Sequence, residues 1–397
     1  MRIKNRIAAR GSHIAAGSGI DKGMREWTTL LRSGRFLFSL ALSTVLLTAG
    51  ILWSLPSEIS VFSNETKVVN LPLKNIRISG LPQETLVPGG QSVGVKMDVK
   101  GVLVVGLEEI DAEDGTLVNP GLDAGLQIGD SILSINGQTM DNAAHVAETV
   151  NDIQGEVTLR VQRKNKTLKI RLSPVRSAED GSYKMGIWVR DKTAGIGTLT
   201  YYDPEKKAFG ALGHAITDPE TGTVLSVANG ELLRSKVESV KQGKAGTPGE
   251  IRGIFYEADL PLGKLVGNSR YGIFGTAEEA ITNPLYDRAL PIGYQGEVKK
   301  GPAYILTTLD GNTVERFSIA IEKINRQSEP DTKSMVIRVT DPRLLEKSGG
   351  IIQGMSGSPI IQNDKIIGAV THVFVNDPEK GYGIFIEWML KEENRAL

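Results

Sequence analysis

The residues best suited to chemistry form the run Gly354-Met355-Ser356-Gly357-Ser358-Pro359, which lies between two apolar stretches. Glycines two residues before and one residue after Ser356 let the main chain turn tightly. In such a turn the hydroxyl projects and neighbouring N–H groups converge on one point, as nucleophilic catalysis requires. A plain tight turn between strands is the alternative. If Ser356 is a nucleophile, the protein is a hydrolase and the chain must also supply a base and an acid.

Histidine is the usual general base beside a nucleophilic serine. The chain has four histidines, and only His214 and His372 lie in its C-terminal half. His214 stands in the run Phe209–Asp218 between small residues, which leave room for a substrate beside the imidazole. We therefore expect His214 to be the base, with a structural histidine in a turn as the alternative.

The acid must accept the imidazole N–H, fix its tautomer and stabilise the imidazolium. Asp341, in Arg338-Val339-Thr340-Asp341-Pro342, is one candidate. Asp218, four residues after His214, is another, although it precedes a proline and resembles a turn residue. Spacing alone does not decide between them.

Composition narrows the function classes. Lys+Arg and Asp+Glu both number 46 in 397 residues, so no overall charge points to nucleic acid. The 45 glycines and few aromatic residues favour a turn-rich β protein. Cysteine is absent, which excludes disulfides, thiolate metal sites and a cysteine nucleophile. The chain has no His-Glu-x-x-His motif, and we expect neither a metal nor a cofactor.

An uncharged apolar run extends over 36–55, and a helix of this length would span about 30 Å, the thickness of a bilayer core. The preceding arm, 1–35, carries eight basic and two acidic residues. The positive-inside rule then predicts a cytoplasmic arm, a transmembrane anchor or signal anchor, and an extracytoplasmic remainder. A cleaved signal peptide is the alternative, and a buried core helix is disfavoured. Residues 56–86 are polar and mixed, and we interpret them as a stalk.

Residues 87–175 resemble a PDZ domain of the type found in bacterial proteases. The resemblance rests on Ala124-Gly125-Leu126-Gln127-Ile128-Gly129-Asp130, followed by Ser131-Ile132-Leu133-Ser134-Ile135-Asn136-Gly137. It implies a groove that takes an extended peptide by strand addition. The carboxylate-binding loop would fall at Ser92, Val93, Gly94 and Val95, and His145 would lie on the helix that lines the groove. A solvated helix residue is the alternative for His145.

Residues 184–397 alternate as strands with Gly/Pro turns and suit a pair of β-barrels. The serine motif and its following hairpin resemble the C-terminal barrel of chymotrypsin-like serine peptidases. This resemblance implies that Thr371, His372 and Val373 line the substrate cleft. It also implies that the N–H groups of Gly354 and Ser356 form the oxyanion hole. The expected fold is mostly β, with an N-terminal transmembrane helix, a PDZ domain and a chymotrypsin-like double barrel.

The chain from 36 to 397 resembles the stage IV sporulation protein B family of signalling serine peptidases. Three segments carry the likeness, namely 186–198, 209–218 and 349–359. The family's nucleophile maps onto Ser356, its base onto His214 and its acid onto Asp341. One departure from chymotrypsin-like enzymes is that Asp341 lies only 15 residues before Ser356. Either the barrels are rearranged or another carboxylate acts as the acid.

The family implies an endopeptidase that signals between compartments during endospore formation. Its partners would be protein substrates: itself, cleaved within 56–86, and a membrane-bound regulator of the intramembrane protease that processes pro-sigma-K. The catalytic domain would act outside the cytoplasm, in the forespore intermembrane space. Two alternatives remain: a PDZ-containing processing peptidase with a Ser/Lys dyad, and a non-catalytic, membrane-anchored PDZ adaptor.

Overall fold

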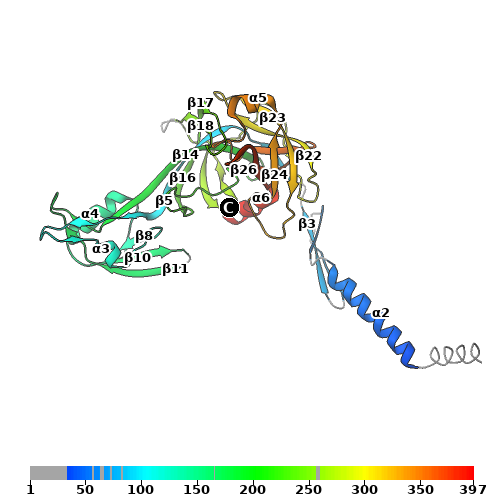
Figure 1. Cartoon of the computed structure of the whole chain (residues 1–397), viewed down its shortest axis with the longest axis horizontal. Coiled ribbons are helices and arrows are strands. Elements are labelled where there is room, and N and C mark those ends of the chain that lie inside the picture. Colours follow the sequence, from blue (N-terminus) through cyan, green and yellow to red (C-terminus); the bar gives the residue numbers. More distant parts are fainter. Residues whose placement is uncertain are drawn as a thin grey trace, which may run out of the picture. The chain divides into compact units, whose positions relative to one another are not determined.

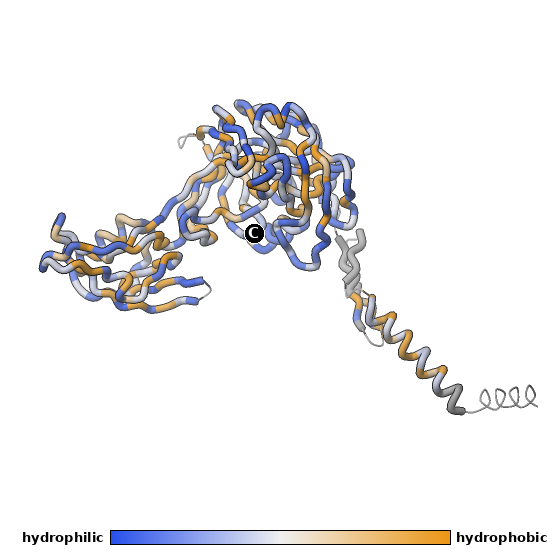
Figure 2. The backbone as a smooth tube through the Cα atoms, in the orientation of Figure 1, coloured by the Kyte–Doolittle hydropathy of each residue, from blue (hydrophilic) through white to orange (hydrophobic). Residues whose placement is uncertain are grey.

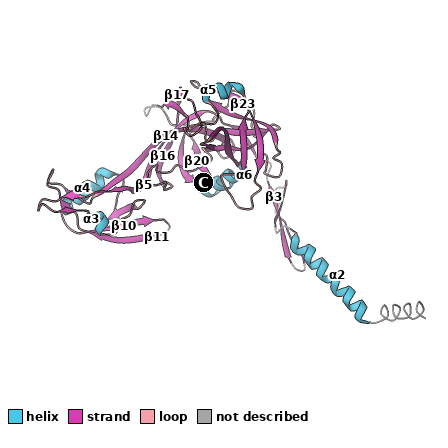
Figure 3. Ribbon diagram, in the orientation of Figure 1, coloured by secondary structure: helices cyan, strands magenta, loops and turns pink. Residues whose placement is uncertain are grey.

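The computed structural model describes residues 34–55, 58–62, 67–71, 74–81 and 84–397 apart from 165 and 256–259. Most of the predicted basic arm, residues 1–33, therefore lies outside the described residues. The chain divides into two compact units, residues 1–83 and residues 84–397. Strands dominate the structure, as expected from the sequence (Figure 3).

The first unit contains α2 (Gly34–Ser54), which covers the apolar run predicted to cross a membrane. Figure 2 shows hydrophobic residues interrupted by less hydrophobic ones along this helix. Among the latter, the hydroxyls of Ser43, Thr44 and Thr48 donate to carbonyl oxygens one turn earlier. Within the described part of the chain, no helix has both the length and the apolar character needed to cross a membrane. The structure thus supports the predicted helix but not the predicted transmembrane span.

The stalk predicted for residues 56–86 contains regular structure. Three strands form a small sheet in which β3 is central, parallel to β1 and antiparallel to β2. They are β1 (Glu58–Phe62), β2 (Lys67–Leu71) and β3 (Lys74–Leu81).

Two long strands organise the second unit. β5 (Ser92–Leu107) and β14 (Ile187–Asp203) pair antiparallel along almost their whole length, from Ser92↔Thr198 to Leu107↔Ile187. Figure 1 shows both strands running from the elements around α4 to the elements around β16. Both strands are irregular near the middle of their paired stretch. Gly101 of β5 has φ +76°, and a register shift follows Arg190 in β14.

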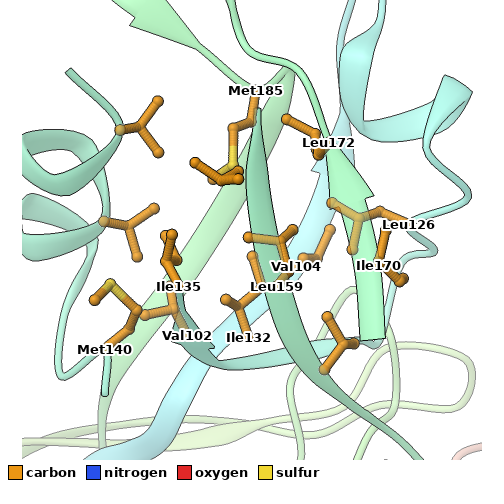
Figure 4. Close-up of a cluster of buried hydrophobic side chains, with 14 residues drawn as sticks. Val102, Val104, Leu126, Ile132, Ile135, Met140, Leu159, Ile170, Leu172 and Met185 are labelled. Carbon is orange, nitrogen blue, oxygen red and sulfur yellow. The ribbon is translucent and has the colours of Figure 1, made fainter. Parts of the chain in front are cut away.

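One end of the β5–β14 pair belongs to a PDZ module. Its buried core gathers apolar side chains from strands and helices around β5, including Val102, Val104, Ile132, Leu159 and Met185 (Figure 4). Asp130 of the Gly-Asp motif is fully buried, where it accepts from the Gln127 N–H and pairs with Arg163 at 2.7 Å. The module's elements are β6 (Ile110–Asp111), β7 (Leu117–Val118), α3 (Pro120–Asp123), β8 (Ser131–Ile135), β9 (Gln138–Thr139), α4 (Ala143–Ile153), β10 (Val157–Arg163), β11 (Lys166–Leu172), β12 (Val175–Arg176) and β13 (Tyr183–Lys184).

The other end of the pair belongs to a first barrel. Strands β5, β16, β19, β20, β15 and β14 follow one another by pairing, and the β5–β14 pairing closes this ring of six. β4 and β21 extend the sheet beyond β14. The additional elements are β4 (Thr85–Pro88), β15 (Ala208–Ala211), β16 (Val227–Arg234), β19 (Gly263–Ser269), β20 (Gly272–Ala277) and β21 (Leu290–Pro291).

A second barrel follows in the chain and closes in the order β22-β23-β24-β27-β26-β25. Its strands are β22 (Gly301–Thr308), β23 (Val314–Ile324), β24 (Met335–Val339), β25 (Pro359–Gln362), β26 (Lys365–Phe374) and β27 (Asp377–Phe385). The remaining elements are the hairpin of β17 (Lys236–Lys241) and β18 (Glu250–Ile254), and the helices α5 (Pro342–Ser348) and α6 (Ile386–Ala396). The expected PDZ module and pair of barrels are therefore present.

The linear division into a PDZ domain at 87–175 and a peptidase domain at 184–397 needs correction. Residues 92–99 of β5 pair with β14 and β16 in the first barrel, not with PDZ strands. The PDZ module is thus inserted into the first barrel. The chain leaves the barrel along β5, forms the module and returns to the barrel along β14. Long-range pairing fixes this arrangement, and local sequence patterns do not show it.

Candidate active site

The turn that carries Ser356 follows α5 and leads into β25. Gly354 and Gly357 both have positive φ, +94° and +96°, which favours glycine. A side chain at Gly357 would also clash with the carbonyl oxygen of Thr198 and the backbone of Leu212. The sequence prediction of a glycine-dependent turn at Ser356 agrees with this geometry.

The Ser356 side chain is half-buried, and its hydroxyl donates to the carbonyl oxygen of Thr371 at 2.7 Å. Within the described residues, the backbone N–H groups of Gly354 and Ser356 make no hydrogen bond, whereas those of Met355, Gly357 and Ser358 all do. The two groups predicted to form the oxyanion hole are thus the unpaired donors of this turn.

His214 comes directly after β15, through Leu212 and Gly213, which both have positive φ. Its Nδ1 lies 2.8 Å from the carbonyl oxygen of Ala215. Because a carbonyl only accepts, Nδ1 carries the proton and Nε2 keeps its lone pair. The segment after His214 is braced by Asn268, whose side chain bonds both the N–H and the carbonyl of Ile216 at 2.8 Å.

Ser356 and His214 line one cleft of about 510 Å³. The first barrel contributes residues 193–196 of β14 and the His214 loop, and the second contributes the Ser356 turn and the end of β26. All residues predicted for the cleft and oxyanion hole line it: Gly354, Ser356, Thr371, His372 and Val373. The ring centroids of His214 and His372 lie 5.1 Å apart. The individual catalytic roles of these residues stay predictions.

Both histidines of the cleft favour the neutral form. Burial lowers the pKa of His214 below the ordinary value of 6.5, and its bond to Ala215 opposes this only in part. The pKa of His372 is lowered to about 4, first by burial and then by the nearby His214 and Lys333. A neutral His214 with a free Nε2 is the form that a general base requires.

Asp341 lies elsewhere. It is the N-cap of α5, where its Oδ1 accepts from the Arg343 N–H at 3.0 Å and its Oδ2 accepts from the Ser318 N–H at 3.2 Å. The Arg343 guanidinium also donates to both carboxylate oxygens, and it holds the pKa of Asp341 below its usual value. Asp341 lines a different hollow, with Tyr286 and Arg316. The structure therefore does not bring the predicted acid to His214, because capping and ion pairing occupy its carboxylate.

The alternative acid, Asp218, also has other partners. It is fully buried, its Oδ1 accepts from the Thr221 N–H at 2.8 Å, and its Oδ2 forms an ion pair with the Arg190 guanidinium at 2.8 Å. Asp218 thereby ties the loop after His214 to β14. Among the described residues, no carboxylate bonds His214, and the carbonyl of Ala215 occupies the place of the acid.

The predicted carboxylate-binding loop of the PDZ domain needs correction. Ser92, Val93, Gly94 and Val95 are buried in β5, and strands β14 and β16 pair with its two edges. No edge remains there for an added peptide strand. His145 does lie on α4, as predicted, half-buried and 2.8 Å from the Gln138 amide. α4 packs beside β13 and the start of β14, through Tyr183 N–H to Asn151 Oδ1 and Ala143 N–H to Asp191 Oδ2, both 2.9 Å.

Sequence reasoning missed the part that β14 plays in the site. Residues 193–196 line the cleft, and Thr198 bonds the Ser356 turn. A signal was present, because 186–198 was one of the three segments with family likeness. Nothing in that run, however, indicates which barrel wall or turn it contacts.

Two six-stranded barrels with a serine and a histidine in one cleft define a two-barrel serine peptidase, here with a PDZ module inserted in its first barrel. The chain belongs to the SpoIVB peptidase S55 family, whose sequence model matches residues 181–390. A PDZ domain model matches residues 120–163. The resemblance to the stage IV sporulation protein B family is therefore confirmed.

Individual relatives match smaller parts. A curated relative, a putative zinc metalloprotease of Helicobacter pylori, is 31% identical over 137 residues, which cover 32% of this chain and 37% of that protein. Among solved structures, the active form of the Rv3671c protease from M. tuberculosis is 16% identical with a TM-score of 0.30, covering 51% of this chain and 74% of its own. The PDZ domain of an SdrC-like protein from Listeria monocytogenes is 18% identical with a TM-score of 0.19, covering 23% and 87%.

Replacing Asp341 distinguishes a cap from a triad acid. We expect Asp341→Asn to keep the cap of α5 and most peptidase activity, at a stability cost of about 1 kcal/mol. Asp341→Ala should lower stability and activity together, because α5 leads into the Ser356 turn. Peptide hydrolysis and urea unfolding measure both effects. A loss of about 10⁴-fold in kcat for Asp341→Asn with unchanged stability would instead identify a catalytic acid.

If His214 is the general base, its lowered pKa sets the acid limb of the activity. We expect kcat/KM to rise with pH through the pKa of folded His214, with a midpoint below 6.5. For stability, the unfolded chain binds this proton first, so stability should fall as pH drops from 6.5 towards the folded pKa. A pH profile of peptide hydrolysis tests the first expectation, and urea unfolding of Ser356→Ala tests the second. A midpoint above 6.5 would contradict both.

Proposed function

We propose that the chain is a serine endopeptidase that signals between compartments during endospore formation. Its substrates are the chain itself, within 56–86, and a membrane-bound regulator of the intramembrane protease that processes pro-sigma-K. Family membership and the meeting of Ser356 with His214 in one cleft support this proposal. Its action outside the cytoplasm stays a prediction from the sequence.

The shape of the site supports cleavage within a chain. A second hollow of about 880 Å³ adjoins the Ser356 cleft and shares His214, Ala215, Thr217 and His372 with it. An extended substrate therefore has space on both sides of the histidine pair. Such space on both sides of the scissile bond is what an endopeptidase needs.

The mechanism is acyl transfer. The Ser356 hydroxyl, which donates to Thr371 in this structure, turns towards Nε2 of His214 as it attacks the peptide carbonyl. Nε2 accepts the hydroxyl proton and later gives it to the leaving amine, and water then hydrolyses the acyl-enzyme by the same route. The N–H groups of Gly354 and Ser356 stabilise the oxyanion.

The Ala215 carbonyl fills part of the role that a carboxylate has in a catalytic triad. It holds Nδ1–H and so fixes the tautomer that leaves Nε2 free. A neutral carbonyl stabilises the imidazolium less than a carboxylate does, since hydrogen bonds to ionised acceptors are about twice as strong. A slow peptidase is the expected result, which suits a signalling enzyme.

The two alternative functions have less support. A Ser/Lys dyad needs a lysine beside the nucleophile, and the described residues that line the Ser356 cleft include none. A non-catalytic PDZ adaptor would not need a histidine with a free Nε2 in the same cleft as Ser356.

Self-cleavage tests the peptidase directly. We expect the purified full chain to trim itself within 56–86, as read by intact mass. Ser356→Ala and His214→Ala should each slow trimming by at least about 10³-fold, because both residues act as one unit. Ser358→Ala is the matched control, since the buried Ser358 hydroxyl has no hydrogen-bond partner. Equal trimming by all four proteins would contradict the proposal. If His214→Ala trims at the wild-type rate while Ser356→Ala does not, the Ser/Lys alternative is favoured.

We also propose that the PDZ module binds an extended peptide along β14 beside α4. Residues 187–190 pair with β5 on one edge, and among the described residues no strand pairs with the other. Edge addition of a strand is the usual PDZ binding mode.

Labelled peptides tiling residues 56–86 test this groove, with Ser356→Ala as the protein and fluorescence anisotropy as the readout. We expect His145→Ala to weaken the tightest peptide several-fold, because His145 lies on α4 with its side chain 26% exposed. Glu148→Ala, an exposed residue of the same helix, is the control. Binding that neither substitution changes would place the peptide elsewhere.

A further inference from the structure

The hydrogen bonds of the Ser356 turn point to a residue on the opposite barrel. Each peptide unit is planar, so fixing its carbonyl also fixes its N–H. The unit joining Met355 to Ser356 presents the Ser356 N–H, one of the two unpaired donors. The units before and after it carry the carbonyls of Gly354 and Ser356.

Both of these carbonyls bond Thr198 of β14. The Thr198 hydroxyl donates to the Gly354 carbonyl at 2.7 Å, and the Thr198 N–H donates to the Ser356 carbonyl at 3.0 Å. The N–H ends of the same two units are also held, by the carbonyls of Ile352 and Val370. The peptide unit with the Ser356 N–H is held through its own carbonyl, which accepts from the Ser358 N–H at 2.9 Å, and Thr198 bonds the units on either side of it.

Thr198 also contacts the strand that leads to the base. Its carbonyl accepts from the N–H of Leu212, two residues before His214, at 3.2 Å. Only 1% of Thr198 is exposed, so water cannot replace its hydroxyl if that group is removed. The same residue thus touches the nucleophile turn on one side and the histidine segment on the other.

We propose that Thr198 is a positioning residue for peptide hydrolysis. It holds the Ser356 turn so that the N–H groups of Gly354 and Ser356 converge on the oxyanion of the transition state. It touches no reacting atom, and its effect passes through the Gly354 carbonyl. Removing its hydroxyl leaves that buried carbonyl unpaired, and the Gly354–Met355 peptide unit is then held only through the Met355 N–H. This loosens the unit that links the two oxyanion donors.

Thr198→Val in the full chain removes the hydroxyl with little change of volume. We expect kcat for peptide hydrolysis to fall about 10- to 100-fold with KM within twofold, because misplaced oxyanion donors weaken the transition state and not substrate binding. Thr198→Ser should stay within threefold of the wild type. Thr198→Cys, with a weaker donor, should fall between them, and this graded series keeps the proposal testable even where Thr198→Val folds poorly.

Thr200→Val is the matched control. Thr200 lies two residues along the same strand and is fully buried, but its hydroxyl has no hydrogen-bond partner. We expect Thr200→Val to keep wild-type kcat. A peptide boronate, whose tetrahedral adduct uses the oxyanion hole, should bind Thr198→Val more weakly by the same factor as kcat falls.

A purely structural role would change the unfolding temperature of Thr198→Val without changing kcat measured well below it. A kcat for Thr198→Val within threefold of the wild type would overturn the proposal. Equal losses in Thr198→Val and Thr200→Val would overturn it too. Because wild-type activity and the Ser356→Ala loss are measured beside these variants, failure of this proposal is distinguishable from failure of the peptidase mechanism.

Discussion

The antiparallel pairing of β5 with β14 is the constraint on which the rest of the second unit depends. At one end it closes the first barrel, and at the other it supplies two strands to the PDZ module. Its middle places residues 193–196 of β14 in the wall of the cleft. A shift of this register by one residue would turn Thr198 away from the Ser356 turn, since side chains alternate between the faces of a sheet. The cleft wall, the Ser356 turn and the PDZ module therefore all depend on the register of the β5–β14 pair.

The chemistry of the cleft depends on burial more than on charge. His214 and His372 lie close together, and both are kept neutral by desolvation. The two candidate acids, Asp218 and Asp341, instead form ion pairs with Arg190 and Arg343. In the proposed mechanism, backbone groups fill two roles that charged side chains often have: the Ala215 carbonyl orients His214, and the N–H groups of Gly354 and Ser356 stabilise the oxyanion.

Short sequence segments were sufficient to predict those cleft residues whose surroundings are themselves local in sequence. The glycines around Ser356 and the small residues around His214 identified the pair, because backbone conformation and steric room are properties of short segments. Sequence reasoning failed where partners come from far along the chain. Asp341 precedes a proline that begins α5, and this N-cap pattern was readable, but the competing bonds from Ser318 and Arg343 were not. Ser92–Val95 matched a PDZ loop in order along the chain, yet strand pairing placed it in a barrel.

The insertion of the PDZ module has a consequence for how the two activities can be separated. A module joined by a flexible linker can be trimmed away, but here any cut within β5 or β14 opens the first barrel. The chain nevertheless leaves and re-enters that barrel on two neighbouring, antiparallel strands, at Gly101 and Asp191. This is the geometry of a hairpin, so a short turn could replace some ninety residues of module without adding a crossover. The peptidase is in this sense a complete barrel pair that carries its PDZ module as an enlarged hairpin loop.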